Sequence, residues 1–104
     1  MKDIDKEGMS VVISRALRKL KGVDFLHVSL DLDALDPFVA PGVGTPVNGG
    51  LNYREAHLLM ETVHSYGRMT SLEIVEVNPI LDDRNLSAEL AVELVSSAFG
   101  KKII

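Results

Sequence analysis

The order of two short apolar segments and three helix-like segments most constrains how this chain can fold. Val23 to Leu30 follows a glycine, and its shortness favours a strand over a helix. Met69 to Val77 is almost entirely apolar or small, which predicts a second strand. Because helix-like segments precede, separate and follow the strands, the strands should pair in parallel through right-handed crossovers. The chain is therefore expected to form an α/β sheet covered by helices on both faces.

Each helix-like segment has an apolar stripe and a signal that starts or stops it. The expected helices are residues 6–21 (stop Gly22), residues 52–66 (capping box Asn52 with Glu55, stop Gly67) and residues 85–99 (cap Asn85, stop Gly100). The residues expected on their buried faces are Met9, Val12, Ile13, Ala16, Leu17, Leu20, Ala56, Leu59, Met60, Val63, Ala88, Ala91, Leu94, Val95 and Ala98.

Two strands are too few to make a complete sheet of this class. They cannot bury the apolar faces of three helices, and they leave edges without hydrogen-bond partners. No internal repeat or low-complexity segment supplies further strands. We therefore expect residues 1–104 to be a single segment of a larger three-layer α/β/α domain with a parallel sheet.

Composition argues against several classes of protein. The chain has 104 residues, 46% hydrophobic and 25% charged, which is typical of one small globular domain. Its net charge of -4 argues against a nucleic-acid-binding protein. No apolar run approaches the roughly 18 residues of a membrane span, and the acidic start is unlike a signal peptide. The lack of cysteine fits a reducing cytoplasm, where we expect a soluble protein.

Asp31 and Asp33 are the first candidates for chemistry. They stand at the end of the first predicted strand, in SLDLDALD, two positions apart and therefore on one face. The carboxyl ends of strands are where open α/β sheets bind ligands. Two neighbouring carboxylates repel each other unless a cation lies between them, and their hard oxygens suit Mg²⁺, Mn²⁺ or Ca²⁺. The alternative is that one aspartate caps the loop and the other is solvated.

A glycine- and proline-rich loop, residues 34–51, follows the aspartates. It contains four of the eight glycines and three of the four prolines, a mixture that suits a rigid, sharply shaped loop. Loops of this length are uncommon in compact domains unless they are functional or disordered. Glu76 lies near the end of the second predicted strand, so an inward side chain there should meet a metal ion or a cation. An edge position in water is the alternative.

Taken together, these stretches resemble the arginases, members of the ureohydrolase family of dimanganese enzymes. The resemblance rests on SLDLDALDPFVAPGVGTPVNGGLNYREA followed by EIVEVNPILD, and it covers essentially the whole chain. It implies the carboxyl-terminal part of an arginase. The start, MKDIDKEGM, resembles an internal arginase segment, so Met1 is expected to be an internal methionine of a longer enzyme.

The resemblance gives a role to four residues. It implies that Asp31 bridges two Mn²⁺ ions and that Asp33 binds one of them. Thr45, in GTPVNGG, would line the guanidinium end of the substrate pocket, and Glu76, in EVNP, would pair with the guanidinium. The implied reaction is hydrolysis of L-arginine to L-ornithine and urea by a hydroxide that the two metal ions activate.

The family pattern also needs metal ligands that this chain lacks. An upstream histidine, a D-A-H-x-D stretch and a proton-transfer histidine are absent, and His27, His57 and His64 are interpreted as structural or surface residues. We therefore expect the isolated chain to be inactive and to need the missing amino-terminal portion of the enzyme as a partner. Homo-oligomers are expected because exposed strand edges gain stability by pairing. The alternatives are another ureohydrolase, such as agmatinase or formimidoylglutamase, and a non-catalytic α/β interaction module.

Overall fold

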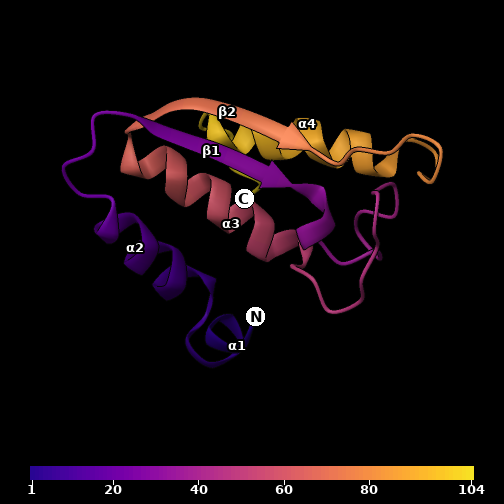
Figure 1. Ribbon diagram of the computed structural model, residues 1–104, viewed down its shortest axis with the longest axis horizontal. Coiled ribbons are helices and arrows are strands. Elements are labelled where there is room, and N and C mark those ends of the chain that lie inside the picture. The colour runs from indigo at the N-terminus through magenta and orange to yellow at the C-terminus, as the bar shows by residue number, and fades with distance from the viewer.

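Two parallel strands form the sheet, and α3 (Tyr53–Tyr66) connects them (Figure 1). β1 (Leu26–Asp31) pairs with β2 (Met69–Val75) in the computed structural model, which describes residues 1–104. The register places Asp31 beside Val75, so the two strands end at the same edge of the molecule. The predicted parallel pairing across a helix is confirmed.

Three helices pack against one face of this sheet. α2 (Met9–Lys19) packs on α3, and α3 packs on α4 (Leu86–Ala98). In Figure 1, α2 and α3 lie below the strands and α4 lies behind β2. Their apolar stripes meet the sheet in one buried cluster, which consists of Met9, Leu30, Leu32, Leu35, Ala40, Val43, Leu51, Ala56, Met60, Leu90, Leu94 and Ala98.

The opposite face of the sheet is polar and exposed. His27 and Ser29 of β1 lie there beside Ser71 and Glu73 of β2. The His27 Nδ1 atom is 2.8 Å from Ser71 Oγ, and hydrogen bonds with Ser29 and His27 lower the pKa of Glu73. Each strand has one neighbour, so one edge of each is unpaired. The α/β class with an incomplete parallel sheet is confirmed, and in this chain helices cover one face of the sheet instead of two.

The ends of α3 are those that the sequence predicts. Asn52 Oδ1 accepts a hydrogen bond of 2.9 Å from the Glu55 N–H, and Glu55 Oε2 accepts one of 3.0 Å from the Asn52 N–H. This reciprocal pair is a capping box that satisfies two free amides of the first turn. Gly67 ends the helix with a left-handed φ of 74°. None of the helices is both long enough and apolar enough to cross a membrane.

Gly8 divides the helix that was predicted over residues 6–21, so that prediction is wrong. α1 (Lys2–Glu7) ends at this glycine, and α2 begins immediately after it. The Gly8 backbone has φ 83° and ψ 154°, which lies far from helical values and favours glycine. The apolar stripe survives the break, because Met9 and Leu17 of α2 are both buried.

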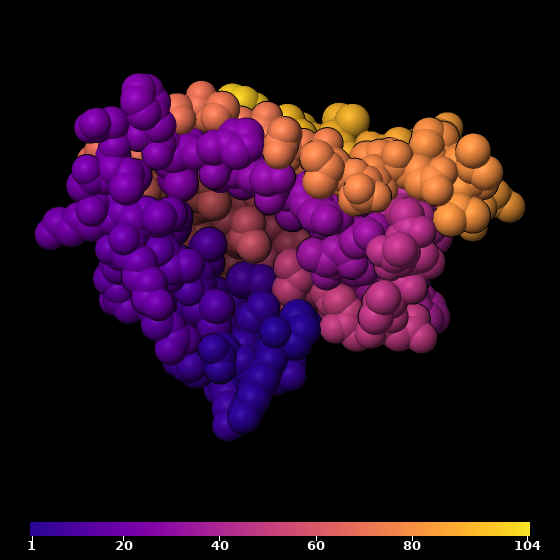
Figure 2. Space-filling view, in the orientation of Figure 1, coloured from indigo at the N-terminus to yellow at the C-terminus, as the bar shows by residue number.

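The start of α4 differs from the prediction in its capping residue. Asn85 occupies the N-cap position, but its φ is 62° and its side chain makes no capping hydrogen bond. The carboxylate of Asp82 caps the helix instead, because it accepts hydrogen bonds from the N–H groups of Ser87 and Ala88. Asp82 belongs to the segment between β2 and α4. In the space-filling view this segment, coloured orange, adjoins the magenta surface of the glycine-rich loop (Figure 2).

Candidate functional site

β1 ends at Asp31, where the chain turns into a short 3₁₀ helix, η1 (Leu32–Ala34). Asp31 Oδ1 accepts a hydrogen bond of 2.8 Å from the Asp33 N–H, which caps this turn. The expectation that Asp31 and Asp33 stand together on one strand is therefore wrong, because β1 ends at Asp31 and Asp33 lies in η1. Leu32 is fully buried and fixes the turn against the core. Both aspartates still stand at the carboxyl end of β1, the usual place of ligand binding in open α/β sheets.

Asp33 joins this turn to the glycine-rich loop. Its Oδ1 atom accepts hydrogen bonds from the N–H groups of Gly44, at 3.1 Å, and Thr45, at 3.4 Å. Its Oδ2 atom accepts one from the Thr45 hydroxyl at 2.5 Å. A residue predicted to bind metal and one predicted to bind substrate are thus in direct contact. A carboxylate has about four acceptor sites, so these bonds leave Asp33 able to bind a cation as well.

Glu76 follows β2 directly and lies beside the same loop. Its φ of 67° is left-handed, which is uncommon for a residue other than glycine and ends the strand two residues before the predicted Val77. A Cβ placed on Gly44 would lie 2.7 Å from Glu76 Oε2, so the carboxylate approaches the loop where Gly44 has no side chain. Gly44 was not predicted as a site residue from the sequence, although it stands in GVGTPV beside Thr45. Glu76 is exposed in this chain.

The loop after Asp33 has a defined shape. Leu35 and Leu51 form an isolated parallel bridge that brings the two ends of the loop together. The Asp36 carboxylate accepts hydrogen bonds from the N–H groups of Phe38 and Gly49, and these two bonds lower the pKa of Asp36. This role of Asp36 was not predicted, although aspartate before proline is a turn signal in the sequence.

The residues present fit part of a metal site. Asp31 and Asp33 offer hard carboxylate oxygens at one strand end, which suits Mg²⁺, Mn²⁺ or Ca²⁺. The chain contains no group of three or more His, Cys, Asp or Glu side chains that could hold a metal ion. Since a hard divalent cation takes roughly six ligands, two carboxylates are an incomplete set. A metal ion at this place would need ligands in addition to Asp31 and Asp33.

The three histidines lie away from the aspartates, as their structural or surface interpretation requires. His27 is on the open face of the sheet, and His64 is exposed on α3. His57 is fully buried between α3 and α4, where its Nδ1 atom is 2.8 Å from Ser97 Oγ. Burial lowers the pKa of His57, and Glu93 offsets this only in part.

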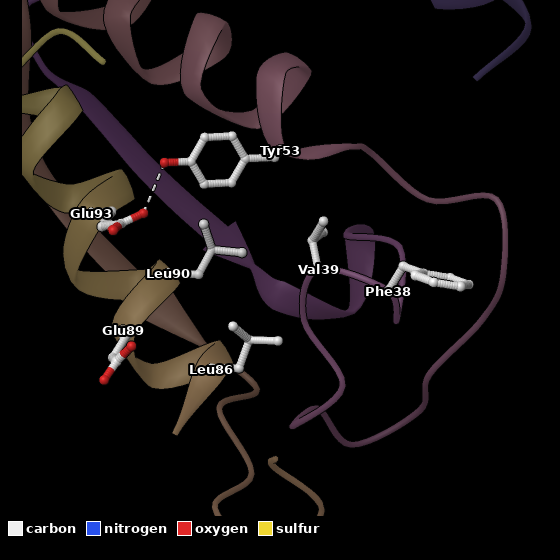
Figure 3. A pocket seen from close by; sticks show the side chains of 7 residues that line it. All are labelled: Phe38, Val39, Tyr53, Leu86, Glu89, Leu90 and Glu93. Carbon is white, nitrogen blue, oxygen red and sulfur yellow. Dashed lines mark hydrogen bonds between the residues drawn. The ribbon is translucent and has the colours of Figure 1, made fainter. Parts of the chain in front are cut away.

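A pocket of about 190 Å³ lies between α4, the start of α3 and the loop (Figure 3). The Tyr53 hydroxyl donates a hydrogen bond of 3.0 Å to Glu93 Oε2 at its border. Asp31, Asp33 and Glu76 do not line this pocket, so the candidate site is the exposed strand-end surface. The lining residues are Phe38, Val39, Tyr53, Leu86, Glu89, Leu90 and Glu93.

Comparisons with known proteins agree on one family. The model of the Arginase family matches residues 1–100. The arginase of Bacillus subtilis (strain 168) is 56% identical over 104 residues, which make up 100% of this chain and 35% of that protein. A crystal structure of Bacillus subtilis arginase superposes with a TM-score of 0.95 at 55% identity, over 99% of this chain and 38% of that chain. The native structure of arginase from Bacillus caldovelox at pH 5.6 superposes with a TM-score of 0.94 at 53% identity, over 99% of this chain and 35% of that chain.

The chain spans about a third of the length of these relatives. Over that third, the sequence alignment covers the whole of this chain and the structural superposition covers 99% of it. The match of the family model over residues 1–100 leaves only the last four residues outside it. The chain therefore belongs to the arginase family.

Proposed function

We propose that this chain supplies the carboxyl-terminal part of an arginase site, which hydrolyses L-arginine to L-ornithine and urea. The observation that carries this proposal is the convergence of Asp33, Thr45 and Glu76 around Gly44 at one end of a parallel sheet. The similar proteins named arginase, at 53 to 56% identity, support the choice of substrate.

Each of the four residues has a role that its chemistry suits. Asp31 and Asp33 would hold part of a pair of Mn²⁺ ions through their carboxylate oxygens. When bound, the ions would supply a water molecule activated as hydroxide. Glu76 offers a planar carboxylate to a planar guanidinium, which favours paired, charge-assisted hydrogen bonds. Thr45, hydrogen-bonded to Asp33, would line the same end of the substrate.

The remaining ligands would come from the other two thirds of the enzyme. The open edge of each strand and the exposed polar face of the sheet are surfaces that such a portion would cover. We therefore expect the isolated chain to produce no urea at any Mn²⁺ concentration, and to self-associate through its open edges. Analytical ultracentrifugation of the isolated chain tests the second expectation, and a strictly monomeric chain would contradict it.

A chimera tests the proposed function. This chain would replace the matching third of Bacillus subtilis arginase, with which it shares 56% identity. Urea release from L-arginine would then be measured with and without added Mn²⁺. We expect Mn²⁺-dependent activity. A folded chimera that binds Mn²⁺ and releases no urea would overturn the proposal.

Two pairs of variants in the chimera separate the site from its surroundings. Glu76→Gln should lower kcat/KM by roughly tenfold or more, because a hydrogen bond to a charged group is lost. Glu73→Gln, on the open face of β2, the strand that Glu76 follows, is its control. Asp31→Asn should weaken Mn²⁺ binding, measured by calorimetry, whereas Asp24→Asn, an exposed aspartate before β1, should leave Mn²⁺ binding unchanged.

A further inference from the structure

The loop that carries Gly44 and Thr45 is hydrogen-bonded through a single residue, Gly42, to the first turn of α4 and to the segment that precedes it. The Gly42 N–H donates a hydrogen bond of 2.7 Å to Ser87 Oγ, and the Asn78 N–H donates one of 2.8 Å to the Gly42 carbonyl oxygen. A Cβ on Gly42 would overlap the Cβ of Asp82, so the two segments touch where Gly42 has no side chain. Gly42 itself is buried.

Asp82 fixes the position of Ser87. Its two carboxylate oxygens accept hydrogen bonds from the Ser87 N–H at 2.9 and 3.1 Å, and Oδ2 accepts one from the Ala88 N–H at 3.2 Å. Burial raises the pKa of the Asp82 carboxyl, but the hydrogen bonds from Ser87, Ala88 and Asp83 outweigh it, and the pKa lies below its ordinary value. Ser87 is fully buried, so its hydroxyl cannot turn to solvent.

Gly42, which makes both of these backbone hydrogen bonds, is only a few residues from the candidate site. Gly44 and Thr45, which follow it, donate to Asp33, and the Glu76 carboxylate lies against Gly44. The segment from 42 to 45 therefore runs from the start of α4 to the residues proposed to bind substrate. A shift at Gly42 would change the spacing between Thr45 and Glu76.

We propose that Ser87, seated by Asp82, is a positioning residue that sets the place of Thr45 relative to Glu76 in the guanidinium-binding surface. This role rests on the proposed function. Ser87 has no hydrogen bond with Asp31, Asp33, Thr45 or Glu76, so it acts only through the bond that it accepts from the Gly42 N–H. Removing its hydroxyl leaves the buried Gly42 N–H without an acceptor, which forces the loop to move.

Ser87→Ala in the arginase chimera tests the role against a matched control. Ser97 lies on the same helix, is also fully buried, and bonds His57 instead of the loop. Ser87→Ala should raise the KM for L-arginine about fivefold with kcat changed less than about twofold, because an interaction that supports binding is lost. Ser97→Ala should leave the KM unchanged. Equal effects of the two variants on the KM would overturn the proposal.

Hydrogen exchange of the Gly42 amide in the 104-residue chain provides a readout that needs no activity. Ser87→Ala should speed this exchange by about tenfold, whereas Ser97→Ala should not change it. An unchanged Gly42 exchange rate in Ser87→Ala would show that Ser87 does not hold the loop. If the parent chimera is folded, binds Mn²⁺ and releases no urea, the proposed function fails and the positioning role fails with it. If the parent is active and only the KM effect is missing, the positioning role alone is wrong.

Discussion

Between α3 and α4 the chain is held by apolar side chains without exposed surface, whereas at the carboxyl end of the sheet it is held by hydrogen bonds at or near the surface. Met60 and Leu94 are fully buried in the first region. In the second, Asp33 and the exposed Thr45 hold each other through charge-assisted bonds. The packed region depends on the volume of its side chains and is little affected by the loss of a single polar atom. The strand end depends on individual hydrogen-bonding atoms, and those surface bonds contribute little to stability. The two regions should therefore respond to opposite kinds of substitution.

The largest effect on stability is expected in the α3–α4 core. Leu94→Ala should reduce the free energy of unfolding by about 3 kcal/mol, because it removes buried methyl groups and leaves a cavity. Val92→Ala on the exposed side of the same helix should change it by less than about 0.5 kcal/mol. Urea denaturation of both variants measures the difference. Similar losses in the two would mean that this core does not dominate the fold.

The next effect separates two glycines of the loop. Gly42→Ala should cost about 2 kcal/mol, because its new methyl group would meet the stem of Asp82 and the segment cannot move freely. Gly44→Ala meets only the end of the Glu76 side chain, which can swing away, so the cost should stay below about 0.5 kcal/mol. Thermal unfolding of the two variants compares them. A larger loss for Gly44→Ala would contradict the assignment of Gly42 as the fixed point.

How well the sequence predicted each region depends on how local its determinants are. Asn52 and Glu55 are three residues apart, so the start of α3 was readable from the sequence. The strand-end site depends on pairs far apart in sequence, such as Asp33 with Thr45, which periodicity cannot reveal. Thr45 became a candidate only through the resemblance to arginases. Backbone conformation was also missed, as at Gly8 and at Glu76, because a left-handed φ leaves no periodic signal.

The N-terminal cap of α4 should give a smaller effect on stability, which distinguishes the observed capping residue, Asp82, from the predicted one, Asn85. Asp82→Ala should cost about 1 kcal/mol, because two amides of the first turn lose their acceptor. Asn85→Gly should change stability by no more than about 0.5 kcal/mol, since the Asn85 side chain caps nothing and glycine accepts its φ of 62°. Chemical denaturation measures both. A greater cost at Asn85 would restore the capping residue that the sequence predicts.

The smallest expected effect is a pH dependence that arises in the core. Burial lowers the pKa of His57 below the ordinary 6.5, while Glu93 and Glu61 act in the opposite sense and Arg54 and Lys101 add to the lowering. The unfolded chain therefore binds a proton at His57 more readily than the folded chain. The associated stability is fully present above pH 6.5 and is lost as the pH falls from 6.5 through the folded pKa.

His57→Asn keeps a partner for Ser97 but cannot titrate, so it should flatten this part of the stability curve. His64→Asn, an exposed change on the same helix, should keep the curve of the parent chain. Urea midpoints measured from pH 7 downward distinguish the two. Because His57 packs between α3 and α4 and Asp33 holds the far end of the sheet, a flattened curve would assign this pH sensitivity to the packed region. If the stability of His57→Asn still depends steeply on pH, the pH sensitivity would instead arise from carboxylates outside the core.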